Sequence, residues 1–231
     1  MIRKNWLIIA AFSATTPLSI STVLAQPTAT KTEANDPKAK ALLDKIEKQY
    51  NGVTSLESDF KLEVKLAEQP KADVQQGKIY QSGDRYRVDM GKNFVVSDGK
   101  TVWLKMDNTV QMKNASSKSA NELLSPKDLL KTIKSKEFSY GMTGETAETW
   151  SKKASLITFK SNKRNGEYTK IVVTVDQKTN YVVSAQAFGR DGGRYKLSLG
   201  QPTAGAKYDD TKFTFDKSKF PNLKVEDLRV D

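Results

Sequence analysis

Runs in which apolar and charged residues alternate constrain the fold of this chain more than any other feature. In the longest run, four apolar residues are interleaved with four charged ones: Phe60, Leu62, Val64 and Leu66 with Asp59, Lys61, Glu63 and Lys65. Shorter runs are centred on Val88 and Val173, and turn signals such as Asn165-Gly166 separate them. A period of two indicates a strand with one dry and one wet face. We therefore predict a mainly β fold, a hairpin-connected antiparallel sheet of roughly ten strands that is long enough to curl on itself.

The segment from Val95 to Met106, VVSDGKTVWLKM, places apolar residues on both sides of an Asp98-Gly99 pair. A type I′ turn needs positive φ at both central residues, and Asp-Gly tolerates this conformation at low cost. The segment is therefore predicted to be two antiparallel strands joined by a type I′ turn at Asp98-Gly99.

A helix is predicted between Pro37 and Asn51. Asp36 is suited to cap its start, Pro37 fits the first helical position, and Asn51-Gly52 ends it. One stripe of the helix is apolar and should lie against the sheet: Ala39, Leu42, Leu43, Ile46 and Tyr50.

A second helical segment interrupts the strands between residues 121 and 134. Ser125 and Pro126 form a helix start, and Asp128 supports it. The segment carries a leucine-rich apolar set: Leu123, Leu124, Leu129, Leu130 and Ile133. We expect it to act as a lid over the concave side of the curled sheet.

The N-terminus is typical of a secretory signal peptide, with a basic start, an apolar run and a small-residue cleavage site after Ala25. We expect a signal peptide over residues 1–25, a flexible linker over residues 26–37 and one soluble domain over residues 38–231. An uncleaved membrane anchor is the alternative, but the apolar run is shorter than the roughly 20 residues of a spanning helix. The sequence has no cysteine, which excludes disulfides and a lipid-modified N-terminal cysteine.

The residue inventory argues against an enzyme. Histidine and cysteine are both absent, so the commonest general base, the thiol nucleophile and the usual transition-metal ligands are missing. The candidate carboxylates, Asp89, Asp98, Asp107 and Asp176, fall at expected turns or on wet strand faces. We therefore expect no catalytic residue, no metal and no cofactor. The net charge of +11 favours anionic partners, although a nucleic acid is not expected for a secreted chain.

Aromatic residues and methionine are frequent on the predicted dry strand faces, and such side chains form adaptable apolar surfaces. Filling a static core is the alternative role for them. Strand parity gives the following candidates for a lipid-binding cavity: Tyr86, Val88, Phe94, Val96, Val102, Leu104, Met106, Ile171, Val173 and Val175.

Several segments together resemble the LolA family of periplasmic lipoprotein carriers over nearly all of the mature chain. The most specific is VSDGKTVW, residues 96–103. Weaker matches are Gly77-Lys78-Ile79-Tyr80, Tyr86-Arg87-Val88-Asp89, Val110-Gln111-Met112, Leu124-Ser125-Pro126, Phe213-Thr214-Phe215 and Val225-Glu226-Asp227. The resemblance implies an incomplete, half-open β-barrel closed by a helical lid, with an apolar cavity for acyl chains.

The same resemblance implies a monomer in the periplasm that binds acylated lipoproteins. Such a carrier receives its cargo from an inner-membrane lipoprotein-releasing transporter and delivers it to an outer-membrane acceptor. The acceptor of this family is anchored through a cysteine, which this chain lacks, so the resemblance favours a carrier. The alternatives are a binding module of the same fold for another lipid, or a periplasmic sensor of lipid or lipoprotein.

The sequence departs from the family pattern at one place. Members often have a basic residue and a proline after the Gly-rich strand start, and the arginine helps to latch the lid. Gln81, Ser82 and Gly83 stand at those positions here. Arg85 and Arg87 are the nearby candidates to replace the latch.

Overall fold

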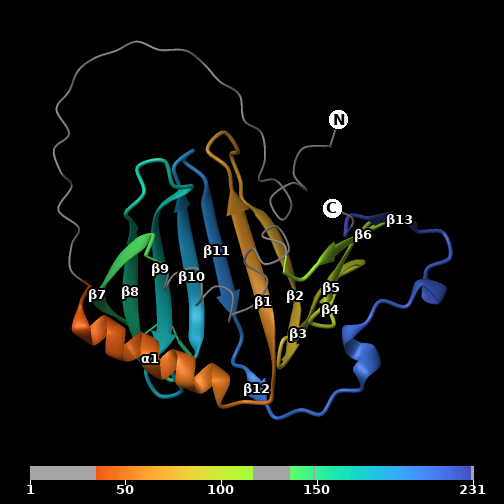
Figure 1. Ribbon diagram of the computed structural model, residues 1–231. Coiled ribbons are helices and arrows are strands. Elements are labelled where there is room, and N and C mark those ends of the chain that lie inside the picture. Colours follow the sequence, from red (N-terminus) through yellow and green to blue (C-terminus); the bar gives the residue numbers. More distant parts are fainter. Residues whose placement is uncertain (1–34, 117–135, 148, 230–231) are drawn as a thin grey trace.

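One large sheet, curved into an open trough with a single helix against its inner side, organises the chain (Figure 1). The computed structural model describes residues 35–116, 136–147 and 149–229. The sheet has thirteen strands, most of them antiparallel, and confirms the predicted mainly β fold. Its two edges do not pair with each other, so the barrel is incomplete.

The elements follow one another closely along the chain. The helix α1 spans Pro37–Asn51, and two short 3-10 helices, η2 and η3, span Asp210–Phe213 and Lys217–Lys219. The strands are β1 Ser55–Lys65, β2 Asp73–Ser82, β3 Arg85–Met90, β4 Asn93–Ser97, β5 Thr101–Met106, β6 Thr109–Asn114, β7 Phe138–Thr146, β8 Ala154–Ser161, β9 Tyr168–Asp176, β10 Val182–Gly189, β11 Arg194–Leu199, β12 Thr203–Ala204 and β13 Lys224–Asp227.

The strand order is β13-β6-β5-β4-β3-β2-β1-β11-β10-β9-β8-β7, with β12 beside β1. Two hairpin-connected halves, β1–β6 and β7–β11, therefore join where β1 pairs with β11. The last strand departs from the antiparallel prediction, because β13 runs parallel to β6. No helix among the described residues has the length and apolar character needed to cross a membrane.

The predicted N-terminal helix is confirmed, with its cap at Asp36. One carboxylate oxygen of Asp36 accepts a hydrogen bond from the N–H of Lys38 at 2.8 Å, and the other accepts one from the N–H of Met142 at 3.0 Å. These two backbone donors lower the pKa of Asp36. The neighbouring Asn35 side chain accepts from the N–H of Tyr140 at 3.0 Å. The start of α1 is thereby fastened to the edge strand β7.

The apolar stripe of α1 packs into the main core as predicted. Ala39, Leu43, Ile46 and Tyr50 are buried, and Leu42 is partly buried. The Tyr50 hydroxyl accepts a hydrogen bond from the N–H of Val182 at 3.3 Å, and its ring meets Tyr181 edge-on at 5.3 Å. Burial raises the pKa of the Tyr50 hydroxyl.

The hairpin of β4 and β5 forms, but its turn differs from the predicted type I′. Only Gly99 has positive φ, at +91°, whereas Asp98 does not. The Asp98 carboxylate instead accepts hydrogen bonds from the N–H groups of Lys100 and Thr101, at 2.8 and 2.7 Å. The turn is therefore centred on Gly99 and Lys100. Asp98 stabilises it through its side chain and does not itself adopt positive φ.

Gly77 lies where the backbones of β2 and β3 come close together. A Cβ atom at this position would lie 1.8 Å from the backbone oxygen of Asp89 and 3.1 Å from Cε1 of Phe60. The backbone of β3 thus comes so close to β2 that only glycine fits between them.

Replacing Gly77 by alanine should lower the free energy of unfolding by about 3 kcal/mol, because the new methyl group forces the two strands apart. Urea unfolding of the variant measures this loss. Gly141→Ala is the matched control on β7, since its Cβ would lie 3.7 Å from the nearest atom, an ordinary contact. Equal stability of the two variants would contradict the close approach of β2 and β3 at Gly77.

Asp176 organises the end of the trough where β9 meets β10. Its buried carboxylate accepts hydrogen bonds from the hydroxyls of Thr149 at 2.7 Å, Ser151 at 2.5 Å and Thr179 at 2.9 Å, and also from backbone N–H groups. Burial alone would raise the pKa of Asp176, but the hydrogen bonds outweigh it and hold the pKa far below its ordinary value.

The variant Asp176→Asn should lose about 2–3 kcal/mol of stability near neutral pH, because an amide cannot accept this set of donors. The Asp176 pKa is lower in the folded than in the unfolded chain, so its contribution is present above about pH 4 and is lost as the pH falls further. The difference between wild type and variant should therefore shrink in acid, as measured by urea unfolding at several pH values. Asp98→Asn, in an exposed turn, is the control and should cost less than about 1 kcal/mol.

Candidate functional site

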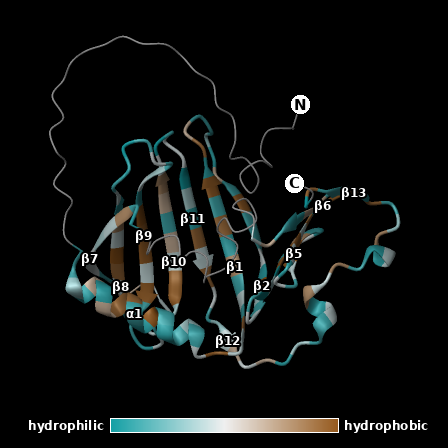
Figure 2. Ribbon diagram, viewed as in Figure 1, coloured by the Kyte–Doolittle hydropathy of each residue, from teal (hydrophilic) through white to brown (hydrophobic). Residues whose placement is uncertain are grey.

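Apolar side chains line most of the concave face of the sheet, which is the face against which α1 packs. On β2 they are interrupted by Gln75 and Gln81. Directly paired residues of six strands form one row of this apolar wall: Leu62, Leu197, Ala185, Val173, Ile157 and Met142. A second row crosses β2 to β5: Ile79, Val88, Val95 and Leu104. Figure 2 shows the apolar stretches on β1 and on β8 to β10, above α1. Such a wall gains free energy from any apolar surface placed on it, at roughly 25 cal/mol per Å².

Eight of the ten residues predicted for the cavity share this concave face. They are Tyr86, Val88, Val102, Leu104, Met106, Ile171, Val173 and Val175. The three from β9 lie in the half of the sheet that α1 crosses (Figure 1). That these residues bind lipid stays a prediction.

Phe94 and Val96 lie on the opposite, convex face, so their predicted place beside Tyr86 and Val88 is wrong. Val88 pairs directly with Val95, and Phe94 pairs with Asp89. The turn between β3 and β4 has two residues, Gly91 and Lys92, so even-numbered residues of one strand face odd-numbered residues of the next. The prediction assumed that even-numbered residues face the same side in both strands. It therefore assigned Phe94 and Val96 to the wrong face. Counting the residues of the turn would have selected Val95.

Part of the concave wall remains accessible. Leu62, Leu104, Met142 and Leu197 are only half-buried, although each packs against the buried core. By contrast, the space between Tyr50 of α1 and the paired residues of β1 and β2 holds a void of about 10 Å³, room for a single water. The contact of α1 with the sheet is therefore tightly packed, and the accessible apolar surface lies beside it.

The residues predicted to form the lid lie outside the described residues. These are Leu123, Leu124, Leu129, Leu130 and Ile133. The structure neither supports nor contradicts their role.

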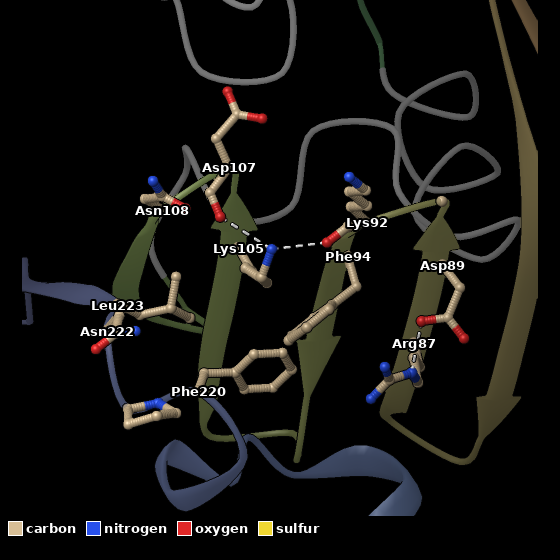
Figure 3. Close-up of a pocket in the computed structure, with 12 residues that line it drawn as sticks. Arg87, Asp89, Lys92, Phe94, Lys105, Asp107, Asn108, Phe220, Asn222 and Leu223 are labelled. Carbon is tan, nitrogen blue, oxygen red and sulfur yellow. Dashed lines mark hydrogen bonds and ion pairs between the residues drawn. The ribbon is translucent and has the colours of Figure 1, made fainter.

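A groove with a volume of about 560 Å³ lies on the convex face. Figure 3 shows the rings of Phe94 and Phe220 side by side in it, with centroids 5.7 Å apart. The Lys105 ammonium donates to the backbone oxygens of Lys92 at 2.7 Å and Asp107 at 3.0 Å. Arg87 lies over the Phe94 ring and bonds to Asp89 at 2.7 Å. Both cations thus have partners within the groove.

Both candidate latch arginines point to the convex face. Arg85 pairs with Asp210 and lies over the ring of Phe213, at 5.0 Å from its centroid. Arg87 belongs to the groove described above. Arg85 thus binds the C-terminal segment on the back of the sheet, on the side away from the concave wall, and Arg87 bonds to Asp89 on the same side.

The C-terminal segment, residues 205–229, covers β2 to β5 from outside (Figure 1). Phe213 is fully buried against Phe94 and Val96. The Tyr208 hydroxyl donates to the Glu57 carboxylate at 2.8 Å. The segment explains why apolar side chains also occur on the convex face of β4.

Three of the four carboxylates considered as catalytic candidates have structural partners. Asp89 bonds to Arg87, Asp98 caps its turn, and Asp176 accepts the hydrogen bonds at the end of β9. The backbone oxygen of Asp107 accepts from Lys105. Within the described part of the chain, no three acidic side chains gather in a way that could hold a metal ion.

A family model described as outer membrane lipoprotein carrier protein LolA matches residues 51–216, from the end of α1 to beyond η2. The chain belongs to the LolA family. The match leaves out the last strand, β13, and most of α1. No curated protein matches the sequence.

Three solved structures are similar to this LolA-family chain. An uncharacterized conserved protein from Thermus thermophilus is 13% identical with a TM-score of 0.55, and the alignment covers 82% of this chain and 99% of that one. A LolA superfamily protein from Nitrosomonas europaea is 11% identical over 77% and 97% of the two chains, with a TM-score of 0.39. The lipoprotein LppX of Mycobacterium tuberculosis is 13% identical over 74% and 99%, with a TM-score of 0.42.

Phe213→Ala should lower the free energy of unfolding by about 3–5 kcal/mol, because it empties the centre of the convex cluster. Limited proteolysis should then cut the C-terminal segment earlier than in the wild type. Phe215→Ala is the control, since Phe215 is only half-buried and should cost less. A Phe213 variant as resistant as the wild type would show that this cluster does not hold the segment.

Proposed function

We propose that this LolA-family chain is a periplasmic carrier that binds the acyl chains of lipoproteins on its concave face and moves them from the inner to the outer membrane. The two apolar rows of the concave face are the observation that supports this most. The family description, outer membrane lipoprotein carrier protein, fits the same role.

An acyl chain needs an escort in water for a simple energetic reason. About a dozen methylenes gain on the order of 10 kcal/mol on leaving water, at roughly 0.8 kcal/mol per CH₂. A carrier must also release the chain, so its binding surface cannot enclose the cargo as tightly as a protein core encloses its side chains. Half-buried residues such as Leu62, Leu104 and Met142 offer contact of this intermediate kind.

The proposed cycle requires partners and a cover. An inner-membrane lipoprotein-releasing transporter would load the carrier, and an outer-membrane acceptor would unload it. The leucine-rich segment around Leu129 would shield the acyl chains in transit. The proposed place of action is the periplasm, reached after removal of the signal peptide over residues 1–25. We propose no catalytic step, since carriers of this family are not enzymes.

Organic extraction of the purified protein, followed by mass spectrometry, identifies any bound lipid. Acyl chains of lipoproteins are the expected result when the protein is isolated with its cargo. Recovery of another lipid class alone would instead favour a binding module of the same fold for that lipid. Recovery of no lipid after incubation with acylated lipoprotein would overturn the proposal.

Leu104→Gln should weaken binding of an acylated lipoprotein by about tenfold, because it puts an amide on the half-buried part of the concave wall. Leu156→Gln is the matched control. Leu156 is also a half-buried strand leucine, but register puts it on the convex face of β8. Both variants should stay folded by circular dichroism, and pull-down with the lipoprotein measures binding. An equal effect of the two changes would place the binding surface elsewhere.

A further inference from the structure

Register gathers four exposed cations and one aromatic ring into a single row on the convex face. Lys65 of β1 pairs with Arg194 of β11, and Arg194 pairs with Phe188 of β10. Phe188 pairs in turn with Lys170 of β9, and Lys170 pairs with Lys160 of β8. Neighbouring strands lie about 4.8 Å apart, so the row crosses five strands as a continuous line. We call these four cations and Phe188 the basic row.

The Phe188 ring lies between two cations of the row. The Lys170 ammonium is 4.2 Å from the ring centroid, and the Arg194 guanidinium carbon is 4.9 Å from it. Phe188 itself is half-buried, whereas the cations on both sides are exposed. The arrangement combines an apolar ring with surrounding positive charge on an open surface.

Carboxylates near the basic row on its own face belong to β1, where Glu63 pairs with Lys61. No exposed convex residue of β8 to β11 is a carboxylate. Other lysines on this side of β1 and β2 have acidic partners, as Lys61 with Glu63 at 2.7 Å and Lys78 with Asp59 at 2.9 Å. Lys65 and Lys170 make no ion pair within the described part of the chain. Directly opposed like charges destabilise a sheet, so an external anion would relieve the row.

The row lies at the end of the trough that α1 does not cross. Lys65 ends β1 and Arg194 begins β11, next to the turns that close the upper end of the sheet in Figure 1. Two turn residues add to the charge there. Arg164 is exposed, and Arg190 joins two turns by bonds to the backbone oxygens of Gly166 and Lys163.

Carboxylates at this end are fewer than the cations. Glu137 pairs with Lys163, and Asp191 accepts a hydrogen bond from the N–H of Gly193 at 2.9 Å. The other acidic residues at this end are Glu167, Glu68 and Asp73, and Lys71 is a further cation beside them. The end of the trough therefore keeps an excess of positive charge.

We propose that the basic row docks this end of the trough on a bilayer surface that carries anionic lipid headgroups. The row is long, open and shallow, which suits an extended charged surface better than a small ligand. Lys and Arg near an anionic membrane each contribute to attraction, and a ring held among cations fits the boundary between headgroups and acyl chains. Docking in this orientation brings the open end of the concave wall to the membrane. The inference deepens the proposed function and rests on it for its biological purpose.

Vesicle flotation with the exported protein, without cargo, tests the docking. Vesicles of equal parts phosphatidylcholine and phosphatidylglycerol should bind the protein, whereas vesicles of phosphatidylcholine alone should not. Binding should weaken with salt, because the screening length falls from about 10 Å at 0.1 M to about 3 Å at 1 M. Equal binding to both kinds of vesicle, or to neither, would overturn the proposal.

The double variant K65Q/K170Q should reduce partition onto the anionic vesicles by about 25-fold, at roughly fivefold for each charge removed. K45Q/K207Q is the matched control with the same change in net charge. Lys45 is exposed on α1, and Lys207 is exposed near β12, at the other end of the trough. The control should bind within about twofold of the wild type. An equal loss in both pairs would assign binding to overall charge and overturn the role of the row.

Cargo binding by K65Q/K170Q separates this proposal from the proposed function. Pull-down with an acylated lipoprotein should be unchanged, since neither lysine lies on the concave face. Vesicle docking by a protein that binds no acylated lipoprotein would support the basic row and contradict the carrier role. Binding of an acidic protein with no vesicle binding would overturn the docking proposal alone.

Discussion

The rest of the structure depends on the pleat of the strands and on the register in which they pair. Because side chains alternate between faces, a fixed register sends every apolar residue of a run to the same side. The result is an apolar wall far wider than α1 can cover. The half-buried residues of the wall beside α1, such as Leu62 and Leu104, are the surface on which the proposed cargo would lie.

The two faces of the sheet are completed in different ways. On the inner side, Asp36 fastens the start of α1 to the edge strand β7, and the stripe around Leu43 fills the space beneath it. On the outer side, the C-terminal segment places Phe213 against β4, and Arg85 pairs with Asp210. The outer side of β8 to β11 is exposed in the described part of the chain, and the basic row lies there except for Lys65 of β1. Apolar, covered and charged surfaces are thus separated by strand parity and by the path of the chain.

Local signals in the sequence were sufficient for the helix and for most strands. Asp36, Pro37 and Gly52 mark the limits of α1 because capping depends on neighbouring residues alone. The assignment of faces failed at Phe94 and Val96, where it depended on the number of residues in a turn. The parallel pairing of β13 with β6 could not be foreseen, because it joins residues more than a hundred positions apart. The basic row was hidden for the same reason, since its lysines are scattered singly along the sequence and meet only through pairing.

The position of β13 has a consequence for how the molecule is completed. Synthesis delivers the chain from its N-terminus, so β6 exists long before the residues from Lys224 onward that occupy its outer edge. During that interval β6 offers a free row of backbone donors and acceptors to any neighbouring strand. A chain truncated before β13 would keep this unpaired strand edge permanently. The final residues therefore cover the edge of β6 in the complete chain, and chains that lack them are prone to associate with each other.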